Sequence, residues 1–273
     1  MLHDRIYFEN EPEDVYLDTY VCDPISTYTR KAILVIPGGG YHGVCSDREG
    51  EPIAMAFIPH GYNAFVLHYS VNRTKTFPAQ LIQVSKAIKH IRDNAEKYDI
   101  DPDRLYTVGF SAGGHLCASI ATMWDMKEIY EQIDMPMGYN KPTGAMMIYP
   151  VITGGMPYSH NGSFRNLVGH DELTEEDLQK TNICNHVRKN SVPAFIAHTV
   201  NDQAVGVQNS LDLAKAYTDA GVPYELHIYP DAPHGFALGN AITKTKTEKH
   251  DNPCIAQWVS HAAAWADYMA EKY

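Results

Sequence analysis

The chain has 273 residues, of which 44% are hydrophobic, and it carries a formal net charge of −11. This length is sufficient to bury a large core, and we expect residues 1–273 to form a single domain. The negative charge disfavours nucleic acid and anionic membranes as partners, and no apolar stretch approaches the ~20 residues that a membrane-spanning helix needs.

Patterns typical of strands and helices alternate along the sequence. The predicted strands cover residues 15–20, 31–36, 62–68, 104–109, 144–149, 193–199 and 224–229. The predicted helices cover residues 52–59, 77–98, 112–124, 207–220 and 253–271. We expect the first strand to be antiparallel at the sheet edge. The alternation predicts the α/β class, with a mostly parallel, doubly wound sheet and helices on both faces.

A nucleophile pattern lies between a predicted strand and a predicted helix. The stretch Gly109–Gly113 reads G-F-S-A-G and fits the G-x-S-x-G pattern of a nucleophile elbow. A strand that turns sharply into a helix needs small residues beside the turning serine, because the two backbones pass close together. The turn would expose the hydroxyl of Ser111 near the positive end of the helix, so Ser111 is the candidate nucleophile.

A serine nucleophile needs a base, and the base needs an orienting acid. Asp202 follows the predicted strand 193–199, and His234 follows the strand 224–229. Catalytic groups of open α/β sheets gather at the carboxyl ends of strands, and the order Ser, Asp, His is that of α/β hydrolases. Ser111, Asp202 and His234 are therefore the predicted catalytic residues. Asp231 is the alternative acid, which we interpret as a turn residue.

A glycine-rich loop follows the strand at residues 31–36. Three glycines in the segment 37–40 allow backbone N–H groups to turn toward a substrate without an obstructing Cβ. Acyl transfer develops a negative oxygen that such N–H groups stabilise, so the amides of Gly39, Gly40 and Ala112 are the predicted oxyanion hole. A phosphate-binding loop is the alternative, but the sequence lacks the lysine and the following acidic residue of such motifs.

Other polar residues near these motifs are candidates for a supporting role. Tyr41 and His42 follow the glycine loop and Tyr69 follows a predicted strand, so these three residues are the candidate substrate pocket. We interpret His115 as a packing or capping residue. Residues 47–49 are interpreted as a salt-bridged support rather than a binding site.

These motifs carry a family resemblance over residues 30–270. The segments G-G-G-Y and G-F-S-A-G-G-H, with the later H-T-V-N-D-Q-A-V and H-G-F, resemble the α/β-hydrolase superfamily, on the side of small bacterial esterases similar to acetyl-xylan-esterase-like and hormone-sensitive-lipase-like enzymes. The resemblance implies the fold, the Ser–Asp–His set and the oxyanion loop. It also implies short acyl esters, such as acetate on sugars or xylo-oligosaccharides, as substrates. Pro37 and Gly206 depart from the residues that such families often carry there.

The segment 151–191 interrupts the alternation of strands and helices. Hydrolases often insert a lid after this strand, and long loops in compact domains tend to carry function. This segment is therefore a candidate lid over the site, and a solvated excursion is the alternative. Thr174, with Asp177 three residues later, is positioned to cap a short helix.

The remaining features bound cofactors, partners and location. Five widely spaced cysteines are typical of reduced thiols, and the start of the sequence lacks the apolar core of a signal peptide, so we expect a cytoplasmic protein. Neither C-x-x-C nor H-E-x-x-H occurs, so we expect no metal and no cofactor. The expected partner is a small ester substrate. A homo-oligomer is compatible with the sequence.

Two other functions share these features. A serine peptidase of the prolyl-oligopeptidase kind uses the same residue order, but that family usually adds a large N-terminal propeller, and only about thirty residues precede the first core strand here. A hydrolase-like binding protein without chemistry usually lacks one of the three catalytic residues, whereas this chain has all three. The sequence therefore favours a serine carboxylester hydrolase.

Overall fold

The computed structural model describes residues 1–246 and 252–272 and contains an eight-stranded sheet. The strands are ordered β1-β2-β4-β3-β5-β6-β7-β8; β2 pairs antiparallel with β1 and β4, and the neighbours from β4 to β8 are parallel. The strands are β1 (Arg5–Tyr7), β2 (Tyr16–Tyr20), β3 (Arg30–Ile36), β4 (Tyr62–His68), β5 (Ile100–Phe110), β6 (Gly144–Ile148), β7 (Ala194–Thr199) and β8 (Tyr224–Tyr229). The predicted mostly parallel α/β sheet is confirmed.

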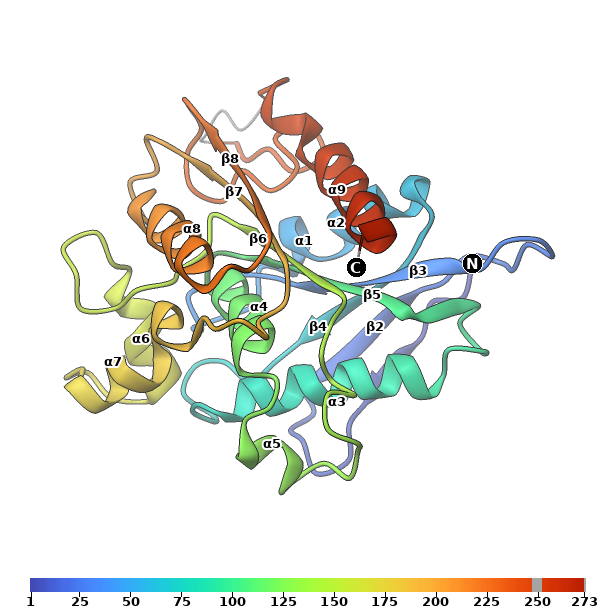
Figure 1. Cartoon of the computed structure of the whole chain (residues 1–273), viewed down its shortest axis with the longest axis horizontal. Helices are drawn as coiled ribbons and strands as arrows, with labels where there is room; N and C mark the ends of the chain where they lie inside the picture. Colours follow the sequence, from blue (N-terminus) through green and yellow to red (C-terminus); the bar gives the residue numbers. More distant parts are fainter. Residues whose placement is uncertain (247–251, 273) are drawn as a thin grey trace.

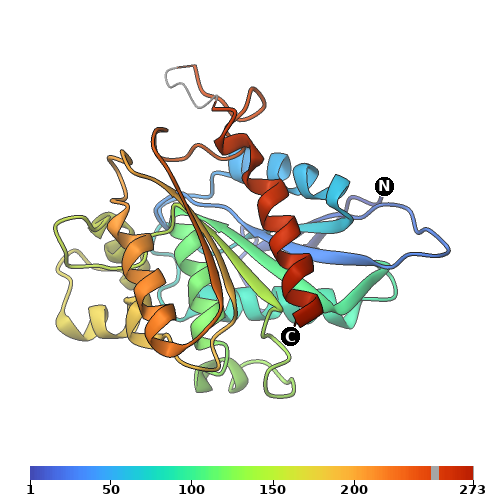
Figure 2. The same cartoon turned by 45° about the horizontal axis from the view of Figure 1, so that its top comes forward.

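Helices cover both faces of the sheet (Figure 1). One face packs against α3, α4 and α8, and the other against α2 and α9, which Figure 2 shows running across the sheet. The longer helices are α2 (Glu51–Phe57), α3 (Ala79–Asp93), α4 (Ser111–Met123), α6 (Asn161–Val168), α7 (Glu175–Thr181), α8 (Gln208–Ala220) and α9 (Trp258–Lys272). Single turns form α1 (Ser46–Glu49) and α5 (Lys127–Tyr130), with 3-10 turns η1 (Ile58–His60), η2 (Ile183–His186) and η3 (Ile255–Gln257).

The core follows the two-residue periodicity of the strands. In β3, Leu34 packs on the α3 and α4 side, while Ile33 and Val35 pack on the α2 and α9 side, and all three are fully buried. Continuous apolar strands of this kind are expected where helices cover both faces of a parallel sheet. Among the described residues, none of the helices is long and apolar enough to cross a membrane.

Two predictions are wrong, one on the position of a strand in the sheet and one on the length of a helix. The early strand, β2, is not at the sheet edge, because the short strand β1 pairs with it on the outside. Only three residues long and largely exposed, β1 has too little apolar pattern to be predicted. Helix α3 is also shorter than the predicted 77–98, since it covers Ala79–Asp93 and a turn follows.

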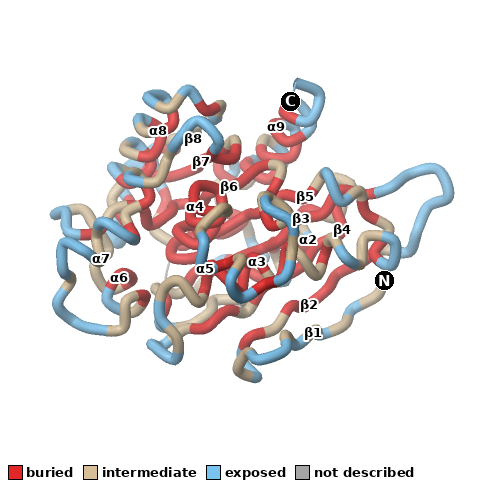
Figure 3. Tube along the Cα trace, turned by 60° about the horizontal axis from the view of Figure 1, so that its bottom comes forward, coloured by how far each residue is buried: buried red, intermediate tan, exposed pale blue. Residues whose placement is uncertain are grey.

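The insert after β6 is partly helical and lies at the periphery (Figure 3). It contains α6, α7 and η2, and its outer helix α7 is mostly exposed. The predicted cap is present, because the Thr174 hydroxyl accepts the N–H of Asp177 and the Asp177 carboxylate accepts the N–H of Thr174. Such a capping box fixes where α7 begins.

Candidate active site

A tight turn between β5 and α4 presents Ser111. The serine has a φ of 52°, a left-handed conformation that non-glycine residues seldom adopt. A Cβ at Gly113 would lie 2.1 Å from the carbonyl oxygen of Ile36, and one at Gly109 would lie 2.2 Å from that of Gly113. Both glycines are therefore required by close backbone contact, which is the mechanical reason for the G-x-S-x-G pattern.

The structure brings Ser111, His234 and Asp202 into one hydrogen-bonded chain, here called the Ser–His–Asp constellation. Nδ1 of His234 donates to Oδ2 of Asp202 at 2.7 Å, and Nε2 of His234 accepts from the hydroxyl of Ser111 at 2.8 Å. The Asp202 carboxylate thus fixes the imidazole tautomer in which Nε2 is free to accept a proton. This is the geometry that a serine nucleophile and its base require.

Asp202 is held by further donors. Its Oδ1 accepts the N–H groups of Ala204 at 2.9 Å and Val205 at 2.8 Å. Nε2 of the fully buried His198 donates to the carbonyl of Val205 at 2.9 Å and lies 3.3 Å from Oδ2 of Asp202. Burial by itself raises the pKa of Asp202, but the hydrogen bonds from His198 and His234 outweigh it and bring this pKa well below its ordinary value. Asp202 is therefore ionised at neutral pH despite its burial.

The rival acid does not contact His234 through its carboxylate in this arrangement. The carboxylate of Asp231 instead accepts a hydrogen bond from the side-chain amide of Asn201 and lies at the exposed surface. The Asp231 carbonyl accepts from Asn252, as expected of a residue that shapes a turn.

The glycine loop adopts conformations that require glycine at two positions. Gly39 has a φ of 128° and Gly40 a φ of 65°, and a Cβ at Gly39 would lie 2.2 Å from the carbonyl oxygen of Gly43. Among the described residues, no hydrogen-bond acceptor is recorded for the N–H groups of Gly39 and Gly40. The amide of Ala112 follows Ser111 in the first turn of α4. The glycine loop and the start of α4 thus lie beside Ser111.

A cavity of about 320 Å³ joins the glycine loop to the Ser–His–Asp constellation. Its lining combines small and polar residues from four segments of the chain: Gly39, Gly40, His42, Cys45, Arg48, Glu49, Ser111, His160, Gly162, Asn166, His234 and Gly235. A few convergent polar groups in a concave site are typical of a small-molecule site.

Only one of the three predicted pocket residues lines this cavity. His42 lies in the lining. Tyr41 is buried, and its hydroxyl bonds to Nδ1 of His115 at 2.8 Å, while the buried hydroxyl of Tyr69 donates to the carbonyl of Pro37 at 2.7 Å. The prediction for Tyr41 and Tyr69 is therefore corrected: both hold the glycine loop from behind. His115 is a buried packing residue, as expected.

The insert and helix α1 supply lining residues that the sequence reasoning missed. The amide of Asn166 donates to the carbonyl of Gly40 at 2.9 Å, so α6 directly contacts the glycine loop. His160 lies at the start of α6, and its burial lowers its pKa. Arg48 donates to the carbonyl of Gly235 at 3.1 Å. These contacts join segments far apart in the chain, and no local motif marks them.

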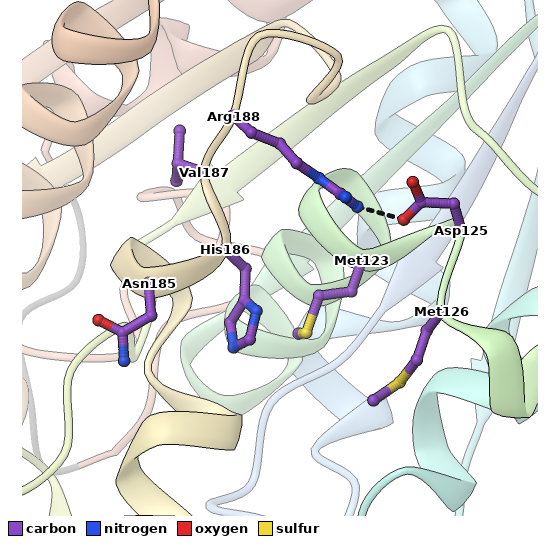
Figure 4. Close-up of a pocket in the computed structure, with 7 residues that line it drawn as sticks. All are labelled: Met123, Asp125, Met126, Asn185, His186, Val187 and Arg188. Carbon is purple, nitrogen blue, oxygen red and sulfur yellow. Dashed lines mark hydrogen bonds and ion pairs between the residues drawn. The ribbon is translucent and has the colours of Figure 1, made fainter.

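A second cavity, of about 360 Å³, lies between the end of α4 and the segment around η2 (Figure 4). The side chains of Arg188 and Asp125 form an ion pair across it, as the dashed line shows. Its lining holds a histidine but no serine or cysteine nucleophile, so it lacks the groups that acyl transfer requires. Within residues 1–246 and 252–272, no group of three or more His, Cys, Asp and Glu side chains is arranged to hold a metal ion.

The parallel sheet, the strained serine turn and the Ser, Asp, His order together define an α/β hydrolase. Comparison with known proteins places the chain within this class. A family model described as BD-FAE matches residues 17–217, and one described as the dienelactone hydrolase family matches residues 178–263. The chain belongs to the BD-FAE family.

Similar proteins include enzymes that act on esters and on xylan. The chain is 40% identical over 215 residues to endo-1,4-beta-xylanase B of Butyrivibrio fibrisolvens and 30% identical over 213 residues to an acetylxylan esterase of Xylanibacter ruminicola. Each match covers 77% of this chain but only 33% and 42%, respectively, of the relative. The chain thus spans less than half the length of these curated relatives.

A solved structure resembles the chain over nearly its whole length. The acetyl ester-xyloside bifunctional hydrolase of Caldicellulosiruptor lactoaceticus is 30% identical, with a TM-score of 0.84, and the match covers 98% of this chain and 96% of that one. A carboxylesterase of Lactobacillus plantarum, 24% identical with a TM-score of 0.86 over 99% and 98% of the two chains, shares the fold.

Proposed function

We propose that the chain is a serine carboxylester hydrolase that cleaves short-chain acyl esters, with acetylated sugars or xylo-oligosaccharides as its substrates. The observation that carries this proposal is the hydrogen-bonded chain from Ser111 through His234 to Asp202, which opens into the same cavity as Gly39 and Gly40. Nucleophile, base and candidate oxyanion donors thereby face one space, and the orienting acid Asp202 is buried behind His234.

The proposed reaction is a two-step acyl transfer. The oxygen of Ser111 attacks the acyl carbon while Nε2 of His234 takes the hydroxyl proton, and His234 then gives this proton to the leaving alcohol. Asp202 stabilises the imidazolium that forms in between. The N–H groups of Gly39, Gly40 and Ala112 stabilise the negative oxygen of each tetrahedral intermediate. Water activated by His234 then cleaves the acyl-enzyme and releases the acid.

The character of the cavity and of the relatives supports the substrate class. The cavity is small, and His42, Arg48, His160 and Asn166 place polar groups around it, which suits a short acyl group and a hydroxyl-rich alcohol better than a lipid chain. The similar proteins are described as an acetylxylan esterase and an acetyl ester-xyloside hydrolase. Because α6 contributes part of the wall, we propose that the segment 151–191 contacts the substrate.

The test is ester hydrolysis by the wild type and by Ser111→Ala. We expect p-nitrophenyl acetate to be cleaved fastest, with a steep loss of kcat/KM beyond butyrate, and acetate to be released from an acetylated xylo-oligosaccharide. Ser111→Ala should lose activity by at least about a thousandfold, because the nucleophile is gone, with a melting temperature within a few degrees of the wild type.

Retention of activity by Ser111→Ala would remove Ser111 as the nucleophile. A preference for octanoate or longer chains would contradict the sugar ester while leaving the acyl-transfer chemistry in place. Cleavage of a peptide p-nitroanilide in preference to the esters would favour a peptidase.

A further inference from the structure

Glu49 places a buried carboxyl group beside the Ser–His–Asp constellation. It is the last residue of the single turn α1, and only 3% of it is exposed. Its Oε2 accepts the N–H of Gly38 at 2.8 Å, and its Oε1 accepts the hydroxyl of Tyr149 at 2.8 Å. Gly38 directly precedes Gly39 and Gly40, so one carboxylate oxygen holds the base of the glycine loop.

The other oxygen reaches the loop that carries His234. Tyr149, which follows β6, accepts the N–H of Ala237 at 3.1 Å with the same hydroxyl that it donates to Glu49. Its ring packs edge-on against His234, with ring centroids 5.0 Å apart, and against Phe236, at 4.6 Å. Tyr149 therefore contacts the histidine loop through both its ring and its hydroxyl, and Glu49 fixes the orientation of that hydroxyl.

The hydrogen bonds around Glu49 match the ionised form. The N–H of Gly38 can only donate, and the Tyr149 hydroxyl already accepts from Ala237 and has its proton free for Glu49. A protonated carboxyl would add a third hydrogen atom beside the two Glu49 oxygens, each of which already faces a donor, the N–H of Gly38 or the hydroxyl of Tyr149. The geometry therefore fits a carboxylate, which presents one accepting oxygen at each of the two points.

We propose that Glu49 is a positioning residue for acyl transfer, which joins the glycine loop to the histidine loop through its two carboxylate oxygens. One oxygen fixes Gly38 and hence the direction of the N–H groups at Gly39 and Gly40. The other fixes Tyr149 and hence the approach of His234 to Ser111. This inference rests on the proposed function, because a positioning role has meaning only if these groups carry out acyl transfer.

The alternative is a buried acid that serves folding alone, and the energetics speak against it. Burial raises the pKa of Glu49, and the hydrogen bonds from Tyr149 and Gly38 offset only part of this effect. The charge therefore costs folding free energy at neutral pH, and the two hydrogen bonds that hold it are directed at the glycine loop and at Tyr149. The titratable groups that interact with Glu49 are Cys45, Arg48, Tyr69, Tyr149 and His234.

The experiment compares Glu49→Gln with the wild type in ester hydrolysis. Gln keeps the shape but presents one acceptor instead of two, so either Gly38 or the hydroxyl proton of Tyr149 loses its acceptor. We expect kcat to fall by about tenfold to a hundredfold while KM changes by less than about twofold, because misplaced donors and base weaken the transition state more than the bound substrate. The concentration of active sites is determined by titrating Ser111 with a fluorophosphonate.

The matched control is Glu11→Gln. Glu11 is also a largely buried carboxylate, held by Lys75, Lys86 and Gln83 outside the cavity lining, so its replacement reports the general effect of losing a buried acid. We expect Glu11→Gln to lower the melting temperature and leave kcat unchanged. Glu49→Gln should show the opposite pattern, with kcat lowered and the melting temperature maintained or raised.

Tyr149→Phe is the second variant, since it keeps the ring against His234 and removes only the hydroxyl. We expect a smaller fall in kcat than for Glu49→Gln, and a double variant whose loss is less than the product of the two, because both remove one link. Unchanged kcat in Glu49→Gln, or an equal fall in Glu11→Gln, would overturn the inference. If Ser111→Ala remains active, the proposed function itself fails, which is a separate result.

Discussion

Asp202 and Glu49 are two buried carboxyl groups that reach His234 by different routes, Asp202 by a hydrogen bond and Glu49 through the ring of Tyr149. They are almost equally buried, with 6% of Asp202 and 3% of Glu49 exposed. Burial raises the pKa of both, yet the pKa of Asp202 is lowered overall and that of Glu49 is raised overall. A small exposed fraction therefore does not by itself fix the direction in which the pKa shifts.

The number and charge of the donors explain the difference. Within the part of the chain that the structure describes, Asp202 has four donors nearby: the N–H groups of Ala204 and Val205, Nδ1 of His234 and, at 3.3 Å, Nε2 of His198, which also donates to the carbonyl of Val205. Glu49 has two, both neutral. Because each hydrogen bond to a carboxylate favours its charged form, four donors overcome the desolvation and two do not. A buried carboxylate can thus stabilise the fold, as Asp202 does, or lower its stability while it positions other groups, as we propose for Glu49.

The largest effect that we expect from this comparison is the difference in kcat between Asp202→Asn and Asp231→Asn. An amide at residue 202 presents an N–H where His234 needs an acceptor, so the imidazole adopts the wrong tautomer and kcat should fall by about ten-thousandfold. Asp231→Asn keeps the turn and should change kcat by less than about threefold. Both are measured with p-nitrophenyl acetate, and the reverse order would assign the acid to Asp231.

A smaller effect is expected when one donor to Asp202 is removed. His198→Leu takes away the buried imidazole, whereas His198→Gln can place an N–H at the position of Nε2. We expect His198→Leu to lower kcat by about tenfold and the free energy of unfolding by about 1–3 kcal/mol, because the buried Asp202 carboxylate and the carbonyl of Val205 both lose a donor. His198→Gln should recover most of both. Equal losses in the two variants would show that packing, and not the hydrogen bond to Asp202, is what His198 provides.

The sequence was sufficient for the features that local patterns encode. The alternation of strands and helices predicted the sheet, and the segment 31–36 nearly coincides with β3. Ser111, Asp202 and His234 could be proposed together because each follows a strand, and parallel strands end at one edge of the sheet. Because backbone contacts at Gly109 and Gly113 leave no room for a Cβ, this part of the pattern can be recognised in the sequence.

The rest depended on contacts between distant segments. The bond from Tyr149 to Glu49 joins residues 100 positions apart, and that from Asn166 to Gly40 joins residues 126 apart. Nothing in the spacing of Arg48 and Glu49 distinguishes a surface ion pair from a buried anchor. Tyr69 was misplaced for the same reason, because the end of a strand does not reveal whether a side chain turns to the cavity or to the core. Tertiary packing decides these positions.

The smallest expected effect concerns the pH dependence of stability. The pKa of Glu49 is raised by burial, so its contribution to folding is full below the ordinary Glu pKa of about 4.3 and is lost as the pH rises through the folded value. The contribution of Asp202, whose pKa is lowered, is full above the ordinary Asp pKa of about 3.9 and is lost only as the pH falls below it. Between pH 4.5 and 8 the contribution of Asp202 to stability is therefore constant, whereas that of Glu49 decreases as the pH rises.

Urea denaturation between pH 4.5 and 8 measures this difference. In a His234→Gln background, Glu49→Gln should gain stability relative to its parent as the pH rises. Asp202→Asn should lie below the parent by a constant amount. Glu11→Gln is the control, since the hydrogen bonds from Lys75, Lys86 and Gln83 outweigh burial and lower the pKa of Glu11, so its difference should also be constant. If the difference for Glu49→Gln is equally constant, burial does not raise the pKa of Glu49, and the contrast between the two carboxylates fails.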